Sequence, residues 1–281
     1  MGEARQDPMV EKMRELDLKE KKKILVCGGG SGAHALAAIS AHDGFEVKVL
    51  TILGDEAELW TKALQENKGK TKAVFLESCF AHTTCEKCKQ KFNKTCMVCK
   101  ERFDSRSKLF KHLWKEEHAK DLEMEGEILT VTKEAGDVVP WADVIILCAP
   151  AFAHRELLTA IAPHLKKMTT KEDVKNGHII GAFPGCGGFE LEVKDVLGAD
   201  VTKKCSIFSG VTLPWLCRVH DDYYGRSVNI RGFKSYFQVA VEPCETALTD
   251  ISKEIDALRD LLQTMIGSFP IVDVGVNMME G

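Results

Sequence analysis

Three small residues near the start of the chain have the spacing of a phosphate-binding turn. Gly28, Gly30 and Ala33 match the pattern G-x-G-x-x-G/A, after a short apolar segment and before a helical one. In such a turn the first glycine permits a tight bend and the second lets backbone N–H groups approach a pyrophosphate. The third small residue lets the helix pack closely on the strand. The pattern predicts a site for the pyrophosphate of a dinucleotide.

A second group of residues has the spacing of a metal site. Two cysteines separated by two residues are followed, after twelve residues, by two histidines separated by five. This is the two-cysteine, two-histidine zinc finger, in which a β-turn and one helix face supply a tetrahedral site. Phe103 and Leu109 stand where such a finger has its small apolar core. The predicted Zn²⁺ ligands are Cys96, Cys99, His112 and His118.

Further cysteines lie just upstream of this pattern. They fit a duplicated half of the finger, a second zinc site, or thiols without a metal, and the spacing does not choose. The residues concerned are Cys79, His82, Cys85 and Cys88. From Cys79 to Asp121 there are 11 Lys and Arg against 6 Asp and Glu. A basic finger favours contact with nucleic acid or protein, but one finger reads only about three base pairs.

Another candidate region follows the apolar strand predicted for residues 141–150. The strand ends at Ala149 and Pro150, and a helix containing Phe152 and His154 begins there. Strand ends of this kind border the cofactor crevice in parallel α/β folds. His154 has two interpretations, a general acid or base and a residue that bonds locally at the helix N-terminus.

The second predicted strand, residues 45–50, bears on the choice of cofactor. A turn that selects NAD usually has Asp or Glu at the end of this strand for the ribose hydroxyls. Here Leu50 and Thr51 hold that position, and Asp55 is the nearest carboxylate. Because no Lys or Arg cluster follows, we expect NAD, with NADP as the alternative; Thr51 and Asp55 are the candidate contacts.

The elements that position these residues alternate between strand and helix. This alternation predicts an α/β fold, a Rossmann-type doubly wound parallel sheet with a small ββα zinc-finger insertion. The predicted strands 71–76 and 127–132 read as the two sides of a hairpin interrupted at its tip. We therefore expect a polar arm at 1–21, a discontinuous nucleotide-binding domain at 22–76 and 126–281, and the insert at 77–125.

Composition limits the class of protein and its location. With 281 residues, 44% of them hydrophobic, the chain has enough apolar material for a substantial core. No run of 18 apolar residues suits a membrane span, and the charged N-terminus has no apolar signal region. We expect a cytoplasmic protein without a membrane partner, in which the 11 cysteines are thiols or metal ligands rather than disulfides.

Several of these segments together resemble a known family. The stretches CGGGSGAHALA, VKVLTILGDEAELWTKAL, ADVIILCAPAFAHRELLTAIAPHL, GCGGFELEVKDVLG and TLPWLCRV occur in this order and are similar to the nucleotide-binding domain of opine dehydrogenases. The resemblance covers about residues 22–76 and 126–275. It implies reduction, with hydride from NADH, of the Schiff base formed by an amino acid and an α-keto acid such as pyruvate.

The resemblance also implies roles for particular residues. Those that would line the pyrophosphate are Gly28, Gly30, Ser31, Gly32, Ala33 and His34. Those that would lie along the cofactor are Ala149, Pro150 and Phe152.

Three departures from the family affect the functional prediction. The zinc finger is foreign to it, the segment before TLPW has no glutamate, and the family's catalytic histidine belongs to a second domain. We therefore expect an oxidoreductase of the opine type that carries the cofactor domain without the catalytic domain, binding cofactor without appreciable turnover. The alternative is a non-enzymatic module whose nucleotide fold and zinc finger contact nucleic acid or protein.

Overall fold

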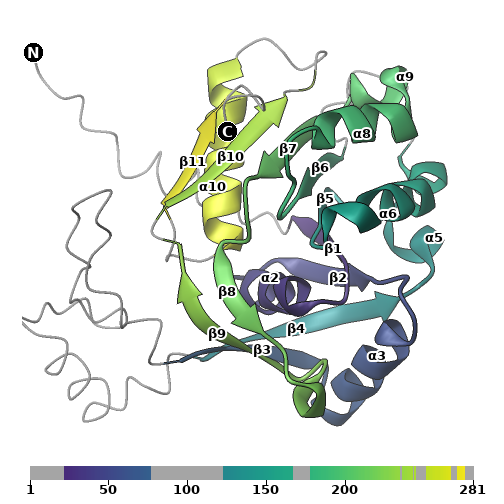
Figure 1. The fold of residues 1–281 in the computed structure, drawn as a ribbon. Coiled ribbons are helices and arrows are strands. Elements are labelled where there is room, and N and C mark those ends of the chain that lie inside the picture. Colours follow the sequence, from purple (N-terminus) through teal and green to yellow (C-terminus); the bar gives the residue numbers. More distant parts are fainter. Residues whose placement is uncertain are drawn as a thin grey trace, which may run out of the picture.

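The computed structural model describes residues 22–76, 123–166, 178–234, 236–242, 244, 251–266 and 271–275. These residues form a mixed α/β fold in which helices cover both faces of one curled sheet (Figure 1). Eleven strands of the described residues make up that sheet.

Six neighbouring strands form its parallel centre. Their order is β4-β2-β1-β5-β6-β7, and each adjacent pair is parallel. This is the strand order 3-2-1-4-5-6 of the doubly wound dinucleotide-binding fold, so the predicted fold type is confirmed at this level. The bounds are β1 Lys23–Cys27, β2 Glu46–Leu50, β4 Glu123–Thr132, β5 Val144–Leu147, β6 Ile179–Ala182 and β7 Ser206–Gly210.

The flanks of the sheet contain antiparallel pairs. β3 runs antiparallel to β4, in agreement with the predicted hairpin, and β8 runs antiparallel to β9 and β10 antiparallel to β7. β8 was not expected from the sequence; it begins at Trp215, directly after Pro214, since proline is tolerated just before a strand. The bounds are β3 Lys70–Phe75, β8 Trp215–Arg218, β9 Ser227–Phe233, β10 Tyr236–Glu242 and β11 Ile271–Gly275.

The helices fall into two sets. α5, α6 and α8 pack with α9 on one face around a core that includes Leu25, Ile145 and Phe189, while α2, α3 and α10 contribute to the core of the other face (Figure 1). The α-helices are α2 Ser31–His42, α3 Glu56–Glu66, α5 Ala135–Val138, α6 His154–Ile161, α8 Phe189–Leu197, α9 Ala199–Thr202 and α10 Ile251–Met265. Short 3₁₀ turns are η3 Ala151–Ala153, η4 Ala162–His164 and η5 Asp221–Tyr223.

Helix α2 lies at the centre of the curl. The strands β4, β3, β9 and β8 bend away from the main sheet and pass around it (Figure 1). Every residue of α2 from Gly32 to Ser40 is buried, which suits a helix of small and apolar residues rather than an amphipathic one. Gly126 in β4 permits this contact, because a Cβ there would lie 2.7 Å from the carbonyl oxygen of Ala38.

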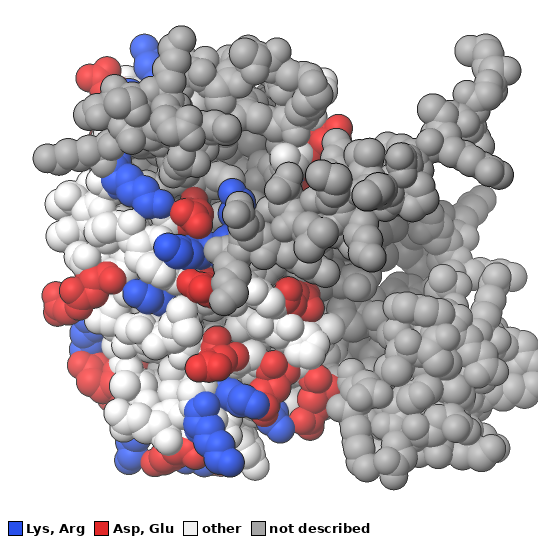
Figure 2. Space-filling model, turned by 180° about the vertical axis from the view of Figure 1, so that it is seen from behind, with Lys and Arg blue, Asp and Glu red and all other residues white. Residues whose placement is uncertain are grey.

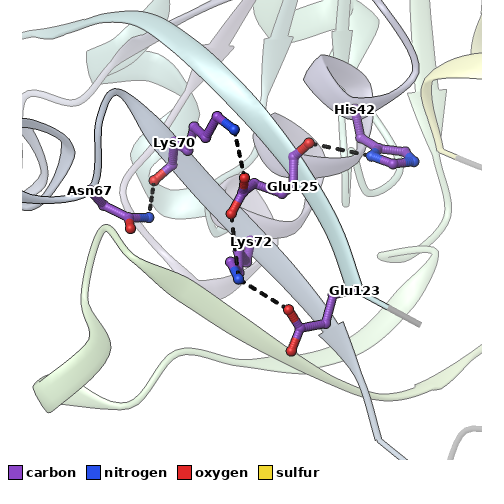
Figure 3. A network of polar contacts seen from close by, with 6 residues as sticks. All are labelled: His42, Asn67, Lys70, Lys72, Glu123 and Glu125. Carbon is purple, nitrogen blue, oxygen red and sulfur yellow. Dashed lines mark hydrogen bonds and ion pairs between the residues drawn. The ribbon is translucent and has the colours of Figure 1, made fainter. Parts of the chain in front are cut away.

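Charged side chains join β3 and β4 on the solvent side, as Figure 3 shows. Lys70 Nζ lies 2.8 Å from Glu125 Oε1, and Lys72 Nζ lies 3.1 Å from Glu123 Oε2 and 3.4 Å from Glu125 Oε2. His42, on α2, also places its Nδ1 3.3 Å from the backbone oxygen of Glu125. Exposed ion pairs contribute little individually, but as a network of opposite charges they favour this register of the two strands.

The hairpin predicted to carry the insert is present at its base. Val74 lies opposite Glu123 in the antiparallel pair, so the chain leaves and re-enters the sheet at neighbouring positions. β4 begins at Glu123, so residues 123–125 lie in the sheet. The prediction that they belong to the insert was wrong. The predicted zinc ligands Cys96, Cys99, His112 and His118, and the cluster from Cys79 to Cys88, lie outside the described residues.

The close approach of β4 to α2 predicts a specific packing cost. We expect Gly126→Ala to lower the free energy of unfolding by about 1–3 kcal/mol or more, because the added methyl group would overlap the backbone of α2. Urea unfolding followed by circular dichroism measures this.

Gly232→Ala in β9 is the matched control. Its Cβ would meet Leu216 Cβ at 3.8 Å, an ordinary contact, and we expect a change of less than about 0.5 kcal/mol. Equal effects of the two substitutions would show that β4 does not depend on glycine to reach α2.

Candidate functional site

The glycine turn between β1 and α2 is tightly constrained on one side. Gly28 has φ +134°, and a Cβ at this position would lie 2.6 Å from the carbonyl oxygen of Cys148 at the end of β5. Its N–H donates to the carbonyl of Leu50 at the end of β2, with N···O 2.8 Å. The first glycine of the pattern therefore bends the chain between two neighbouring strand ends, as predicted.

The turn is open on its other side. From Ile24 to Ser40, only Gly30 and Ser31 are not buried. A Cβ at Gly30 would have no atom of the described residues within 4 Å, and the φ of Gly30, −78°, is one that any residue adopts. The absence of a side chain at Gly30 is therefore needed neither for packing nor for backbone geometry. It leaves room for a group that approaches the backbone of the turn.

The N-terminus of α2 lies at this opening. No side chain of the described residues caps the helix, and the hydroxyl of Ser31 instead accepts a hydrogen bond from the N–H of Val219 at 3.0 Å. The first N–H groups of a helix have no partner within it, and they carry the positive end of the helix dipole. Gly32 and Ala33 are buried, and a Cβ at Gly32 would lie 2.9 Å from Cys148 Sγ, so these two residues serve helix packing. An anion fits this arrangement.

His34 lies beneath the turn. Its Nδ1 donates to the carbonyl of Gly30 and its Nε2 accepts from the N–H of Gly225, both at 3.0 Å. Its ring stacks on Trp60 with the centroids 3.6 Å apart. Its backbone N–H also bonds to Gly30 O. Both ring nitrogens of His34 thus have partners within the protein, and we interpret this residue as a support for the turn.

Further hydrogen bonds connect His34 to α3 and β3. Trp60 Nε1 donates to Thr71 Oγ1 at 3.2 Å, and Thr71 Oγ1 donates to the carbonyl of Gly225 at 2.8 Å. Gly225 has φ +75°, and a Cβ there would lie 2.9 Å from Trp60 Cα. A continuous hydrogen-bonded path thus connects α3 and β3 to the carbonyl of Gly30 through His34.

The candidates at the end of β2 are arranged differently from the prediction. Thr51 is buried and its hydroxyl donates to Glu56 Oε2, while Asp55 is exposed at the start of α3. Tyr224 OH donates to the carbonyl of Gly29 at 3.0 Å. Glu56, which the sequence interpretation passed over, is therefore the carboxylate that lies against the strand end.

The end of β5 separates an exposed residue from a buried one. Phe152 is 88% exposed, and Pro150 is also at the surface. His154 is 1% exposed, and its Nε2 donates to the carbonyl of Ala149 at 3.0 Å. Burial lowers the pKa of His154. This geometry corresponds to the local-bonding interpretation of His154, not to a proton donor open to a substrate.

No group of three or more His, Cys, Asp or Glu in the described residues has the arrangement of a metal site. The described cysteines Cys27, Cys148 and Cys205 are buried free thiols, and Cys186 is an exposed one. Basic and acidic side chains are interspersed on the described part of the face in Figure 2. Among the helices of the described residues, none is long and apolar enough to cross a membrane.

Sequence comparison finds relatives over nearly the whole chain. Octopine dehydrogenase of Pecten maximus is 30% identical over 259 residues, which are 92% of this chain and 50% of that protein. Opine dehydrogenase of Haliotis discus hannai is 31% identical over 264 residues, 94% of this chain and 51% of that protein. These relatives of the chain are opine dehydrogenases. No protein-family model matches the chain.

The fold agrees with this relationship. A solved structure of octopine dehydrogenase with NADH and L-arginine has a TM-score of 0.64 and 28% identity, covering 92% of this chain and 50% of that one. The chain thus spans about half the length of the opine dehydrogenases that it matches.

The sequence interpretation missed several residues that build the site. Glu56, Trp60, Thr71, Tyr224 and Gly225 come from three separate parts of the chain and meet only through the fold of the sheet around α2. One signal was available for the helix, since Glu56 and Trp60 both lie in the segment that resembles opine dehydrogenases. Nothing local to Thr71 or Gly225 indicates their role.

The burial of His34 predicts a dependence of stability on pH. Burial lowers the pKa of His34 from 6.5 to about 4, against the opposing effect of the Gly30 carbonyl. Between these values the unfolded chain binds a proton that the folded chain does not, so stability falls as the pH falls from 6.5 towards 4. We expect wild type to lose about 2 kcal/mol more unfolding free energy than His34→Gln between pH 7 and pH 5.

Urea unfolding at both pH values measures the difference. His178, whose pKa burial lowers to about 4, and Asp43, whose pKa burial raises to about 6, are retained in both proteins and cancel in the comparison. The same pH dependence in wild type and His34→Gln would show that the ring takes up its proton equally in the folded and unfolded states.

Proposed function

We propose that the described fold binds NAD(H) as part of an NAD-dependent oxidoreductase of the opine type. The observation that carries this proposal is the single opening in the central motif: Gly30 and Ser31 are at the surface while the residues around them from Ile24 to Ser40 are buried. The opening is at the uncapped N-terminus of α2, at the carboxyl ends of β1 and β5. Dinucleotides bind at this place in doubly wound folds.

The residues present suit the pyrophosphate. Gly30 leaves space beside the backbone, and the first turn of α2 offers N–H donors and the positive end of its dipole. Gly28 and Gly32 hold the turn against Cys148, and His34 fixes the carbonyl of Gly30 from below. Such rigidity reduces the entropy that would otherwise be lost on binding.

Other residues at the same edge suit the rest of the cofactor. Ala149, Pro150 and Phe152 follow β5, next to β1, and we propose that they lie along the cofactor. When bound, NADH would supply a hydride for reduction of a C=N or C=O bond. His154 holds the carbonyl of Ala149 in place, which positions this edge rather than transferring a proton.

The relatives indicate the class of substrate. We propose an amino acid and an α-keto acid such as pyruvate. One solved structure of octopine dehydrogenase, 28% identical to this chain, holds NADH and L-arginine, and another, 26% identical, holds NADH and pyruvate.

A steric block at Gly30 tests the proposed site. We expect Gly30→Val to fold normally, because a Cβ there meets no atom within 4 Å in the part of the chain that the structure describes. The valine would occupy the space beside the turn, so the affinity for NADH should fall by about tenfold or more through loss of charge-assisted hydrogen bonds. Calorimetric titration with NADH measures the affinity, and thermal unfolding measures the fold.

Gly275→Ala is the matched control. Among the described residues, a Cβ at Gly275 also meets no atom within 4 Å, but this residue ends β11 at the far edge of the sheet. It should leave NADH affinity unchanged. Equal NADH affinity in wild type and Gly30→Val would place the site elsewhere, and absence of NADH binding by wild type would overturn the proposed function.

The zinc site remains a prediction from spacing. We propose that Cys96, Cys99, His112 and His118 bind one Zn²⁺, because all four ligand types stand at finger spacing. Elemental analysis of protein purified without chelator should give about one zinc per chain, and the double variant Cys99→Ser, His112→Ala should lose it.

Cys244→Ser provides the control, since Cys244 is a buried thiol in the described fold and should not affect zinc content. Zinc-free wild-type protein would contradict the prediction. NADH binding should survive zinc loss, because the sheet has its own core.

A further inference from the structure

The carboxyl end of β2 carries a buried polar contact that the proposed pyrophosphate site does not use. Thr51 directly follows β2, is 1% exposed, and donates its hydroxyl hydrogen to Glu56 Oε2. Glu56 is the first residue of α3, and it is only partly buried. The bond turns the Glu56 side chain back from the helix towards the strand end.

The same carboxylate lies against the glycine turn. A Cβ added to Gly29 would overlap the carboxylate of Glu56 and would lie 2.8 Å from Tyr224 OH. Gly29 is the residue between the two glycines of the phosphate-binding pattern. Glu56 therefore stands between the end of β2 and the turn, although it is six residues beyond the strand end in sequence.

The charge at this position is negative. Burial raises the pKa of Tyr224, and the negative charges of Glu56 and Asp55 raise it further. Lys133, a cation near the start of α3, pairs instead with Glu58 at 2.8 Å. The end of β2 thus presents carboxylates to a ligand.

We propose that Glu56 determines the preference of the chain for NAD(H) over NADP(H) by binding the adenosine ribose. An ionised carboxylate has about four acceptor sites, and Thr51 uses one, so others can accept from a ribose hydroxyl. In dinucleotide-binding folds an acid at the end of the second strand has this role. A 2′-phosphate, with a charge of about −2, is repelled by the same carboxylate. This inference rests on the proposed function.

Thr51 is the positioning residue in this arrangement. Thr51 follows β2 and Glu56 begins α3, so the hydrogen bond between them joins the two elements. It fixes the Glu56 carboxylate beside Gly29. Asp55, the nearest carboxylate in sequence, is exposed, and its side chain does not cap α3. The structure therefore favours Glu56 over Asp55 as the ribose contact.

Titration of the full chain with NADH and with NADPH tests the inference. Protein fluorescence gives both dissociation constants without requiring turnover. We expect wild type to prefer NADH by tenfold or more, and Glu56→Gln to reduce the ratio of the two constants by about 10- to 100-fold, because a hydrogen bond to a charged group and a repulsion are lost together. Glu58→Gln removes the same charge two residues away and should leave the ratio unchanged.

Further variants keep the test decisive if Glu56→Gln folds poorly. Thr51→Ser keeps the hydroxyl and should retain the wild-type ratio, whereas Thr51→Val should lower it, with circular dichroism reporting the fold of each. Two results would overturn the inference and leave the proposed function intact. One is an unchanged ratio of the two dissociation constants in a Glu56→Gln variant that still binds NADH. The other is a ratio that falls only in Asp55→Asn. Wild type that binds NADPH as well as NADH would also overturn it. Wild type that binds neither dinucleotide would overturn the proposed function itself.

Discussion

The burial of helix α2 from Gly32 to Ser40 is the constraint on which the rest of the structure depends. A helix enclosed on all sides must be narrow, and the run of Ala, Gly and Ser in α2 meets this requirement. The enclosing strand must also come close, which Gly126 permits. The polar side chains of the buried helix need partners, because an unpaired buried polar group is costly. Ser40 donates to the carbonyl of Met265 at 3.0 Å, and His34 bonds to Gly30 and Gly225.

These contacts make the glycine turn a rigid part of the core instead of a surface loop. His34, Tyr224 and Cys148 contact the turn from three different elements, and each contact holds the backbone in one conformation. The exposed part of the turn is therefore small and fixed. A preorganised set of N–H donors binds an anion without first having to become ordered. The packing of α2 therefore favours the proposed binding of NAD(H).

The sequence predicted the elements whose signals are local. The strand, glycine turn and helix from Ile24 onwards, and the alternation of strands and helices that indicated an α/β fold, depend on periodicity and on the positions of glycine. Contacts between distant parts of the chain were not predictable in this way. The bond from Thr71 to Gly225 spans 154 residues, and the strand at Trp215 is stabilised by pairing with β9 despite the preceding proline. The carboxylate at the end of β2 was also missed, although Glu56 is only five residues from Thr51, because its side chain reaches the strand end by folding back from the first residue of α3.

The central claim is that the exposed N-terminus of α2 receives the pyrophosphate of NAD(H). Hydrogen exchange of backbone amides, measured by mass spectrometry with and without saturating NADH, tests this most directly because it reports the N–H groups themselves. Peptides that cover residues 28–34 should exchange more slowly with NADH, while peptides from β10 and β11 at the sheet edge should not change. Slower exchange confined to other segments, with residues 28–34 unaffected, would contradict the account.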